Sequence, residues 1–337
     1  MIDKVTIRAF KGIDRVELEL APVTVLVGAN GSGKSSVLEG IRGLRAFAFE
    51  GHATEAMKLA RATGRPGTFV ARPSGGGPGV EVGAPSGGTN WVVGWGADDP
   101  PPTFPAVIYS AVSPRELSRP SRLSPEGVDL QPDGSGLAAH VTNLRLEFPQ
   151  RFDDLVARLR RLVPAVRAVR SRSMPAHARY PAMAQGQLID DTPSGTLFQL
   201  LFDFEGAEGI PQAAVSAGTL AATYLLAQAE AARSAEAILL VDDVETGLHP
   251  AAQLEMMGIL RELAADGDHL RVVVTTHSPY VVDAVEPSTV WVLGPGPKGG
   301  SVARRLDSHP DAKKSLEVLT AGEFWGSVGE DWVGEPA

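Results

Sequence analysis

The chain has 337 residues, no cysteine and a formal net charge of −9, from 31 basic and 40 acidic residues. The lack of cysteine excludes disulfides, thiolate metal sites and cysteine nucleophiles, and the negative balance argues against a protein that coats nucleic acid through its overall charge. The sequence has neither the apolar core of a signal peptide at its start nor a run of about 18 apolar residues, so we expect no membrane contact and a cytoplasmic location.

The first 27 residues predict three strands. Alternating apolar residues, such as Val5 with Ile7 and Val16 with Leu18, predict an antiparallel hairpin that turns near Gly12. The β-branched run over residues 23–27 predicts a buried parallel strand. The hairpin is therefore expected to lead directly into a central strand of the sheet.

The segment after this strand fits the phosphate-loop pattern G-x-x-x-x-G-K-[ST] at every fixed position. Glycines let such a loop wrap closely around a phosphate chain, and the N-terminus of the following helix presents partial positive charge to it. Lys34 is expected to reach the β- and γ-phosphates, and the Ser35 hydroxyl is expected to ligate Mg²⁺. The pattern favours a nucleoside triphosphate site over a plain glycine-rich turn. The residues expected to contact the nucleotide are Gly28, Asn30, Gly31, Ser32, Gly33, Lys34, Ser35 and Ser36.

The middle of the chain has two compositions. Residues 64–112 are rich in Gly and Pro with short strand-like pieces, which predicts a small antiparallel β lobe. Residues 113–185 predict an arginine-rich helical insertion, with helices over 137–146 and 152–163. The arginines are either a solvated helix face or a contact for the phosphate backbone of a nucleic acid, and the sequence leaves both open. They are Arg145, Arg151, Arg158, Arg160, Arg161, Arg167, Arg170, Arg172 and Arg179.

Two further buried strands end in polar residues. Asp242 and Asp243 follow the apolar run over 237–241, at the edge of an α/β sheet where ligands bind. We expect Asp242 to bind Mg²⁺, partly through water, and Asp243 to polarise the attacking water; the plainer alternative is that the pair caps the next turn. His277 follows the strand over 270–275, where it can sense the γ-phosphate; the alternative is an ordinary surface histidine.

Together these motifs resemble the ABC-type ATPases of the SMC, RecF and "overcoming lysogenization defect" group. Four segments carry the resemblance: Phe10-Lys11-Gly12, the signature-like run from Val215 to Leu220, the run from Asp242 to Pro250, and Thr276-His277-Ser278-Pro279. The resemblance implies a P-loop α/β fold with a mixed central sheet, an antiparallel β lobe and a helical insertion. It also implies ATP and Mg²⁺ as cofactors and dimers that sandwich ATP, with Ser216 and Gly218 contacting the γ-phosphate of the partner's nucleotide.

The sequence departs from the family pattern at the expected base. Asp243 stands where the family has Glu, so hydrolysis is expected to be slow, or Glu245 shares the role. Val244 replaces the usual proline, Ala217 stands at a signature position where Gly or Asp is common, and no clear glutamine follows the strand over 106–110. The catalytic residues that we expect are Lys34, Asp243, Glu245 and His277.

The spacing of the motifs predicts the domain layout. Ser35 and Asp242 lie too close in sequence for the long coiled coil of SMC proteins, and no sustained heptad pattern occurs between them. Only 44 residues follow Leu293, so we expect no Toprim nuclease domain. We expect an ATPase domain over 1–295 and a C-terminal tail over 296–337. The aromatic residues of the tail form either a docking peptide or a last element packed on the core.

Three functions follow from these expectations. The first is an ATPase that dimerises on ATP and drives or regulates a DNA-related process, in repair or phage defence, with a separate effector. The second is a nucleic-acid-binding protein gated by ATP, with DNA contacting the region from Arg145 to Arg179. The third is a regulatory subunit of a separately encoded nuclease or toxin.

Overall fold

A computed structural model describes most of the chain, namely residues 2–49, 68–73, 80–83, 92–94, 105–122, 130–175, 182–184, 187–189, 196–233, 236–266, 269–297 and 299–335. The chain divides into two compact units. The first comprises Met1–Ser110 and Ala231–Ala337, and the second comprises Ala111–Glu230. Arg179, one of the arginines singled out above, lies outside the described residues.

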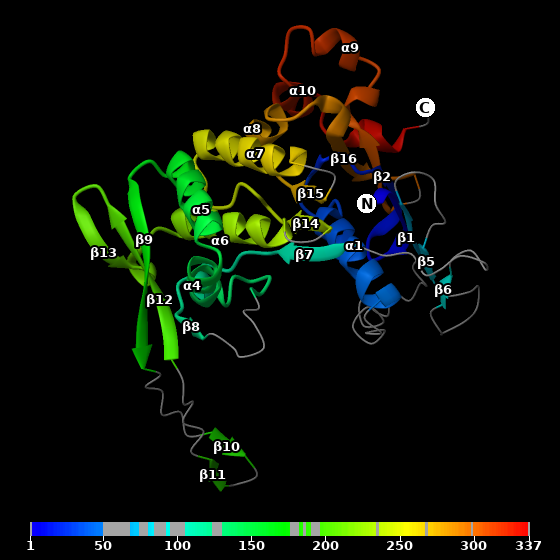
Figure 1. Ribbon diagram of the computed structural model, residues 1–337. Helices are drawn as coiled ribbons and strands as arrows, with labels where there is room; N and C mark the ends of the chain where they lie inside the picture. Colours follow the sequence, from blue (N-terminus) through cyan, green and yellow to red (C-terminus); the bar gives the residue numbers. More distant parts are fainter. Residues whose placement is uncertain are drawn as a thin grey trace. The chain divides into compact units, whose positions relative to one another are not determined.

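A large mixed sheet forms the centre of the first unit (Figure 1). Its described strands run in the order β6-β5-β4-β1-β2-β17-β16-β3-β15-β14-β7. In chain order they are β1 (Ile2–Phe10), β2 (Ile13–Glu19), β3 (Val23–Val27), β4 (Thr68–Pro73), β5 (Val80–Gly83), β6 (Val92–Gly94), β7 (Ala106–Ser110), β14 (Ala237–Val241), β15 (Leu270–Thr275), β16 (Val290–Pro295) and β17 (Ser301–Arg305).

One half of this sheet is parallel. Strands β3, β15, β14 and β7 pair in parallel, with Val25 opposite Val274 and Val241 opposite both Val274 and Ser110. Strands β3, β14 and β15 are buried along their whole length, as expected of parallel strands covered on both faces. Since parallel strands end at one edge, the segments after β3, β14 and β15 all leave from the same side of the sheet.

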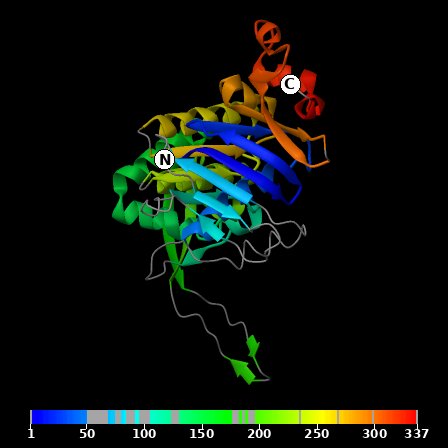
Figure 2. The ribbon, with the colours of Figure 1, turned by 90° about the vertical axis from the view of Figure 1, so that its right-hand side faces the viewer.

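The other half is largely antiparallel. The predicted hairpin is present, with Val5 opposite Leu18, and β4, β5 and β6 extend it on one side; Figure 2 shows these strands next to one another in blue and cyan. The sequence predicts the strand over 106–110 as part of this lobe, but the structure places it as β7 beside β14, at the far end of the parallel half. Its apolar run suits the pairing with β14 better than a place in the glycine-rich lobe.

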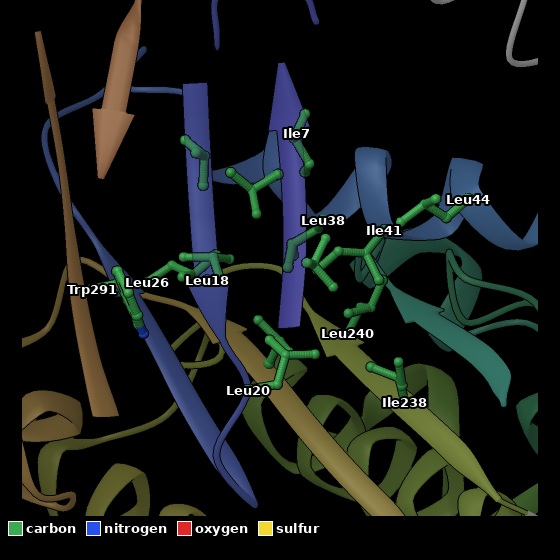
Figure 3. Close-up of a cluster of buried hydrophobic side chains, with 14 of the residues drawn as sticks. Ile7, Leu18, Leu20, Leu26, Leu38, Ile41, Leu44, Ile238, Leu240 and Trp291 are labelled. Carbon is green, nitrogen blue, oxygen red and sulfur yellow. The ribbon is translucent and has the colours of Figure 1, made fainter. Parts of the chain in front are cut away.

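Helix α1 (Lys34–Phe49) packs onto the sheet through one apolar face. Val37, Leu38, Ile41 and Leu44 recur at helical spacing and are fully buried. They meet side chains of β1, β2, β3 and β14, such as Ile7, in the cluster drawn in Figure 3. Each buried apolar side chain of this size contributes roughly 1.5–3 kcal/mol, so the helix that starts at the phosphate loop is firmly anchored.

The C-terminal segment is part of the first unit. After helices α7 (Pro250–Ala265) and α8 (Pro279–Asp283) come α9 (Ala312–Ser315), α10 (Ala321–Val328) and the 3-10 turn η4 (Asp331–Gly334). Phe324 and Trp332 are buried, and both rings pack edge-on against His309. Of the two alternatives for the tail, the structure therefore supports a last element packed on the core.

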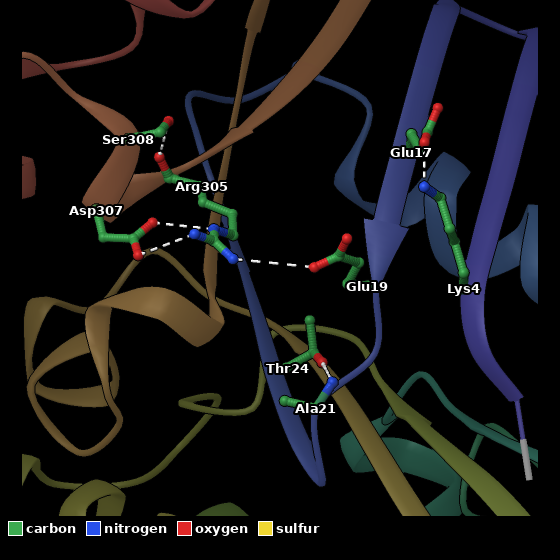
Figure 4. A network of polar contacts seen from close by, with 8 residues as sticks. All are labelled: Lys4, Glu17, Glu19, Ala21, Thr24, Arg305, Asp307 and Ser308. Carbon is green, nitrogen blue, oxygen red and sulfur yellow. Dashed lines mark hydrogen bonds and ion pairs between the residues drawn. The ribbon is translucent and has the colours of Figure 1, made fainter. Parts of the chain in front are cut away.

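Polar contacts join the edges of the hairpin and β17 (Figure 4). Arg305 on β17 contacts both oxygens of Asp307 at 3.0 and 3.2 Å and lies 3.9 Å from Glu19 on β2. Lys4 on β1 pairs with Glu17 on β2. These pairs are at least partly exposed, so each adds at most about 1 kcal/mol to stability.

The second unit combines helices with antiparallel strands. Its elements are α3 (Pro114–Leu117), β8 (Ser121–Arg122), α4 (Leu137–Glu147), α5 (Pro149–Leu162), β9 (Val166–Pro175), β10 (Ala182–Ala184), β11 (Gln187–Ile189), β12 (Thr196–Phe204), β13 (Ala207–Pro211), η1 (Gln212–Ala214) and the start of α6 (Ala217–Ala232). The two predicted helices of the insertion match α4 and α5. The insertion is not all helical, however, because β9 pairs with β12 along its length and buries Val169 opposite Phe202. No described helix is long and apolar enough to cross a bilayer.

Candidate functional site

The phosphate loop has the backbone that its glycines predict. Gly28, Gly31 and Gly33 have φ values of +150°, +79° and +95°, in the region that side chains disfavour. At Gly28 a Cβ would also lie 2.5 Å from the Leu293 carbonyl oxygen. The loop runs from the end of β3 to Lys34, where α1 begins.

Lys34 is folded back along the loop. Its Nζ donates hydrogen bonds to the carbonyl oxygens of Gly28 at 2.8 Å and Ala29 at 3.1 Å, and the residue is buried. Burial lowers the pKa of Lys34, while the nearby charges of Asp243 and Asp242 act in the opposite direction. The ammonium group is thus held at the loop by weak neutral acceptors, which an anionic ligand can replace.

Asp242 joins the ends of several elements. Its Oδ1 accepts hydrogen bonds from the hydroxyls of Ser35 at 3.1 Å and Thr275 at 2.6 Å, and the Tyr109 hydroxyl lies 3.4 Å from Oδ2. Ser35 and Asp242 are 207 residues apart in sequence, so the fold brings the two predicted metal ligands together.

This donor set suits Mg²⁺. A hydroxyl and a carboxylate are hard oxygen ligands, and Mg²⁺ usually takes one or two such groups, with waters and phosphate oxygens completing its shell. In the part of the chain that the structure describes, no group of three or more His, Cys, Asp or Glu could hold a metal by itself. The site fits a metal that is bound together with a nucleotide.

Asp243 is exposed and has a strained backbone. Its φ is +50°, unusual for a residue other than glycine, and its N–H donates to the Thr275 hydroxyl at 2.8 Å. Partial burial of its carboxyl raises the pKa of Asp243, and the negative charges of Asp242 and Glu245 raise it further, while His277 and Lys34 lower it. Such a carboxylate is a stronger proton acceptor than an ordinary aspartate.

Glu245 bonds to the segment that carries His277. Its Oε1 accepts the His277 backbone N–H at 2.7 Å, and its Oε2 accepts the Thr276 hydroxyl at 2.7 Å. Thr276 is fully buried, whereas His277 is exposed. Both oxygens of the Glu245 carboxylate are therefore engaged beside the candidate switch histidine.

A pocket of about 250 Å³ lies over the phosphate loop. It is lined by Asn30, Gly31, Gly33, Lys34, Ser35, Ser36, Asp243 and His277. The structure thus collects most of the predicted nucleotide contacts together with the candidate base and the candidate switch histidine. Gly28, Ser32, Asp242 and Glu245 are close by in sequence or by hydrogen bond but do not line the pocket.

Ser216 and Gly218 belong to the second unit and do not line this pocket. The Ser216 hydroxyl accepts the Thr219 N–H at 3.2 Å, so it caps the start of α6, and the residue is exposed. An exposed cap on a helix of 16 residues leaves the positive helix end available to an anion.

Three further residues of the site were not predicted from the sequence. Thr275 bridges Asp242 and the Asp243 backbone, Thr276 bonds Glu245, and Tyr109 faces Asp242. The two threonines carried a signal, since they are the polar residues that end a buried apolar strand. Tyr109 carried none, because its contribution depends on the pairing of β7 with β14.

Most of the singled-out arginines have partners inside the second unit. Arg158 lies 2.5 Å and Arg151 3.6 Å from the carboxylate of Glu230, which is 1% exposed. Three further arginines on β9 face acceptors: Arg167 pairs with Glu205, Arg170 with Asp203, and Arg172 with Gln199. This pairing favours the structural explanation of the cluster over a free basic patch.

Comparisons with known proteins agree with this geometry. Two family models match: "AAA ATPase domain" over residues 1–52, and "AAA domain, putative AbiEii toxin, Type IV TA system" over residues 123–283. No curated protein gives a significant sequence match.

Three solved structures share the fold. An SMC head bound to the C-terminal winged-helix domain of ScpA has a TM-score of 0.57 at 15% identity, covering 93% of this chain and 99% of that one. An SMC head with an extended coiled coil, bound to the C-terminal domain of ScpA from Pyrococcus furiosus, has a TM-score of 0.52 at 13% identity. This likeness covers 94% of this chain and 98% of that one. The SMC head of Thermotoga maritima has a TM-score of 0.50 at 14% identity, covering 90% of this chain and 98% of that one. These likenesses confirm the predicted fold class.

Proposed function

We propose that the chain is an ABC-type ATPase that binds ATP with Mg²⁺ in the pocket over the phosphate loop and hydrolyses it there. The fold that it shares with SMC heads and the matches to two AAA ATPase domain models support this proposal. The observation that carries the proposal is the meeting of Lys34, Ser35, Asp243 and His277 around one pocket, with Asp242 bonded to Ser35. These groups come from three strand ends that are far apart in sequence.

Each group has a separate task in this proposal. Lys34 exchanges the carbonyl oxygens of Gly28 and Ala29 for phosphate oxygens, a stronger charge-assisted contact. Ser35 and Asp242 would hold Mg²⁺, which supplies charge neutralisation at the phosphates when bound. Asp243 orients the attacking water and accepts its proton, and His277 donates to the γ-phosphate.

We further propose that two copies form a dimer on ATP. The exposed cap of α6, with Ser216 and Gly218, would complete the nucleotide site of the partner copy. ATP would then bias a two-state equilibrium, because one γ-phosphate is contacted by both copies. A Ser216→Arg substitution places bulk and charge at this helix end and is expected to prevent the dimer without preventing ATP binding.

The SMC-like fold supports a DNA-related role for this ATPase, in repair or phage defence, with a protein effector encoded separately. SMC heads in two of the structural likenesses are bound to domains of ScpA, a protein partner. A nucleic-acid clamp gated by ATP is less well supported, since the arginines described on α5 and β9 are paired within their own unit.

The test is ATP turnover by the purified chain, as wild type and as Lys34→Ala. Loss of the phosphate-binding ammonium is expected to reduce kcat by about 10²–10³-fold, while Lys314→Ala, an exposed lysine on α9, leaves kcat unchanged. Equal rates for wild type and Lys34→Ala would refute the site. Stimulation by double-stranded DNA would support the DNA-related role, and indifference to DNA would favour a switch that acts on a protein partner.

A further inference from the structure

The loop after β14 and the loop after β15 are joined by a run of hydrogen bonds. Val244 N–H donates to the Thr275 carbonyl at 3.1 Å, and Asp243 N–H donates to the Thr275 hydroxyl at 2.8 Å. On α7, the helix that follows the loop after β14, Gln253 Oε1 accepts a hydrogen bond from the Ser278 hydroxyl at 2.5 Å. The segment that carries the candidate base and the segment that carries His277 are therefore linked at several points.

Glu245 bonds directly to the backbone of His277. It holds the backbone N–H of His277 itself and the hydroxyl of Thr276, each at 2.7 Å. The Thr276 hydroxyl also accepts the Ser278 N–H at 2.9 Å, and the Thr276 N–H donates to the Leu26 carbonyl on β3 at 3.1 Å. The Glu245 carboxylate thus holds two successive residues at the start of the His277 loop, and the Thr276 backbone ties the same point to β3.

We propose that Glu245 is a positioning residue, which sets the place of His277 relative to Asp243, and that it takes no part in proton transfer. This inference rests on the proposed function, since it assigns a task within the same site. It replaces the prediction that Glu245 shares the role of the base.

Two independent observations favour positioning. Both Glu245 oxygens accept hydrogen bonds from the His277 segment, so the carboxylate is turned toward that loop. Glu245 also does not line the pocket, whereas Asp243 and His277 do. A base must reach the water that it deprotonates, and of the two carboxylates only Asp243 faces the space where that water would be.

Two conservative substitutions distinguish a positioning role of Glu245 from a role as base, because the two roles predict opposite orders of kcat for the two variants. Glu245→Gln has the same length, and its amide can accept the His277 N–H through oxygen and donate to the Thr276 hydroxyl, which also serves as an acceptor. It keeps the geometry and removes the basic group. Glu245→Asp keeps the carboxylate but is one methylene shorter, so it cannot reach both donors without a backbone shift.

If Glu245 positions His277, Glu245→Gln retains kcat within about threefold of wild type. Glu245→Asp then lowers kcat by about 10–100-fold, because small misplacements of catalytic groups have effects of this size. KM for ATP stays within about threefold in both variants, since neither touches the phosphate loop. If Glu245 is a base, the order reverses, and Glu245→Gln loses about as much kcat as Asp243→Asn; that order overturns the proposal, as do equal rates for the two Glu245 variants.

The experiment measures kcat and KM by phosphate release for the full chain, with thermal unfolding of each variant. Glu317→Gln and Glu317→Asp, at an exposed glutamate outside the site, are matched controls and are expected to change neither constant. Lys34→Ala in the same series reports on the proposed function separately. If Lys34→Ala turns over ATP like wild type, the ATPase site is wrong; if Lys34→Ala is inactive but the Glu245 order is reversed, only the positioning role is wrong.

Discussion

At the carboxyl edge of β3, β14 and β15, charged groups from distant parts of the sequence meet around a pocket, while in the second unit the charged groups meet one another. Lys34 donates hydrogen bonds to two neutral carbonyl oxygens, and Asp243 is exposed in the pocket lining. In contrast, Arg151 and Arg158 share the buried carboxylate of Glu230, and Arg170 pairs with Asp203.

The difference lies in whether a charge has an internal partner of opposite sign. A buried ion pair with both members present is satisfied within the fold and has little left to offer a ligand. Lys34 is bound to carbonyl oxygens and lies near Asp243, whose pKa is raised by burial and then by the charges of Asp242 and Glu245, so this group of residues gains from an incoming anion and its metal. The number of arginines in a segment is therefore a weaker sign of ligand binding than whether each arginine has an acidic partner within the fold.

The largest expected effect concerns the buried ion pairs of the second unit. Glu230→Ala leaves Arg151 and Arg158 without their buried partner, so we expect a loss of about 3 kcal/mol in the free energy of unfolding. Urea denaturation measures it. Glu205→Ala, which removes the exposed partner of Arg167 in the same unit, is the matched control and is expected to cost less than about 1 kcal/mol. Equal losses in the two variants would show that burial is not what distinguishes these pairs.

The second prediction concerns the packing of α10 against α8, the helix that comes after the pocket residue His277. Helix α8 follows His277 directly, and α10 lies against it: a Cβ at Gly322 would be 2.4 Å from the Pro279 carbonyl oxygen, and the Gly322 N–H donates to Asp283 at 2.6 Å. Gly322→Ala is thus expected to lose about 1–3 kcal/mol by overpacking. Gly326→Ala, in the same helix with nothing within 4 Å, is expected to gain up to about 1 kcal/mol. Thermal or urea unfolding measures both, and a stable Gly322→Ala would mean that α10 is not tightly seated.

Much of the site could be predicted because its residues have fixed places relative to strand ends. The phosphate loop follows β3, Asp242 follows β14 and His277 follows β15, and in a parallel sheet these ends share an edge. The fold class that the resemblance implied is confirmed, since the chain shares the fold of SMC heads. The individual roles of Asp243, His277 and Ser216 stay predictions.

What the sequence did not predict depends on pairings between segments. Strand β17 was not expected, because Ser301–Arg305 has weak strand character and acquires its structure from β16 and β2. Strand β9 was expected to be part of a helical region, and its pairing with β12 overrides that local expectation. The double hydrogen bond of Glu245 to the His277 segment likewise follows only from two loops meeting in space.

The smallest expected effect concerns a surface pair in the second unit. The Arg170 guanidinium, and then the Gly209 N–H, lower the pKa of Asp203 in the folded chain. A lowered pKa stabilises the fold at pH values above the ordinary pKa of aspartate, and this contribution disappears as pH falls through the lowered value. Asp203→Asn is therefore expected to be slightly less stable than wild type at neutral pH, with a difference that shrinks to zero in acid. Unfolding of both proteins across pH measures it; for Asp154→Asn, an exposed aspartate on α5, we expect no such trend, and a difference for Asp203→Asn that grows toward acid would show that Arg170 does not stabilise the charged form.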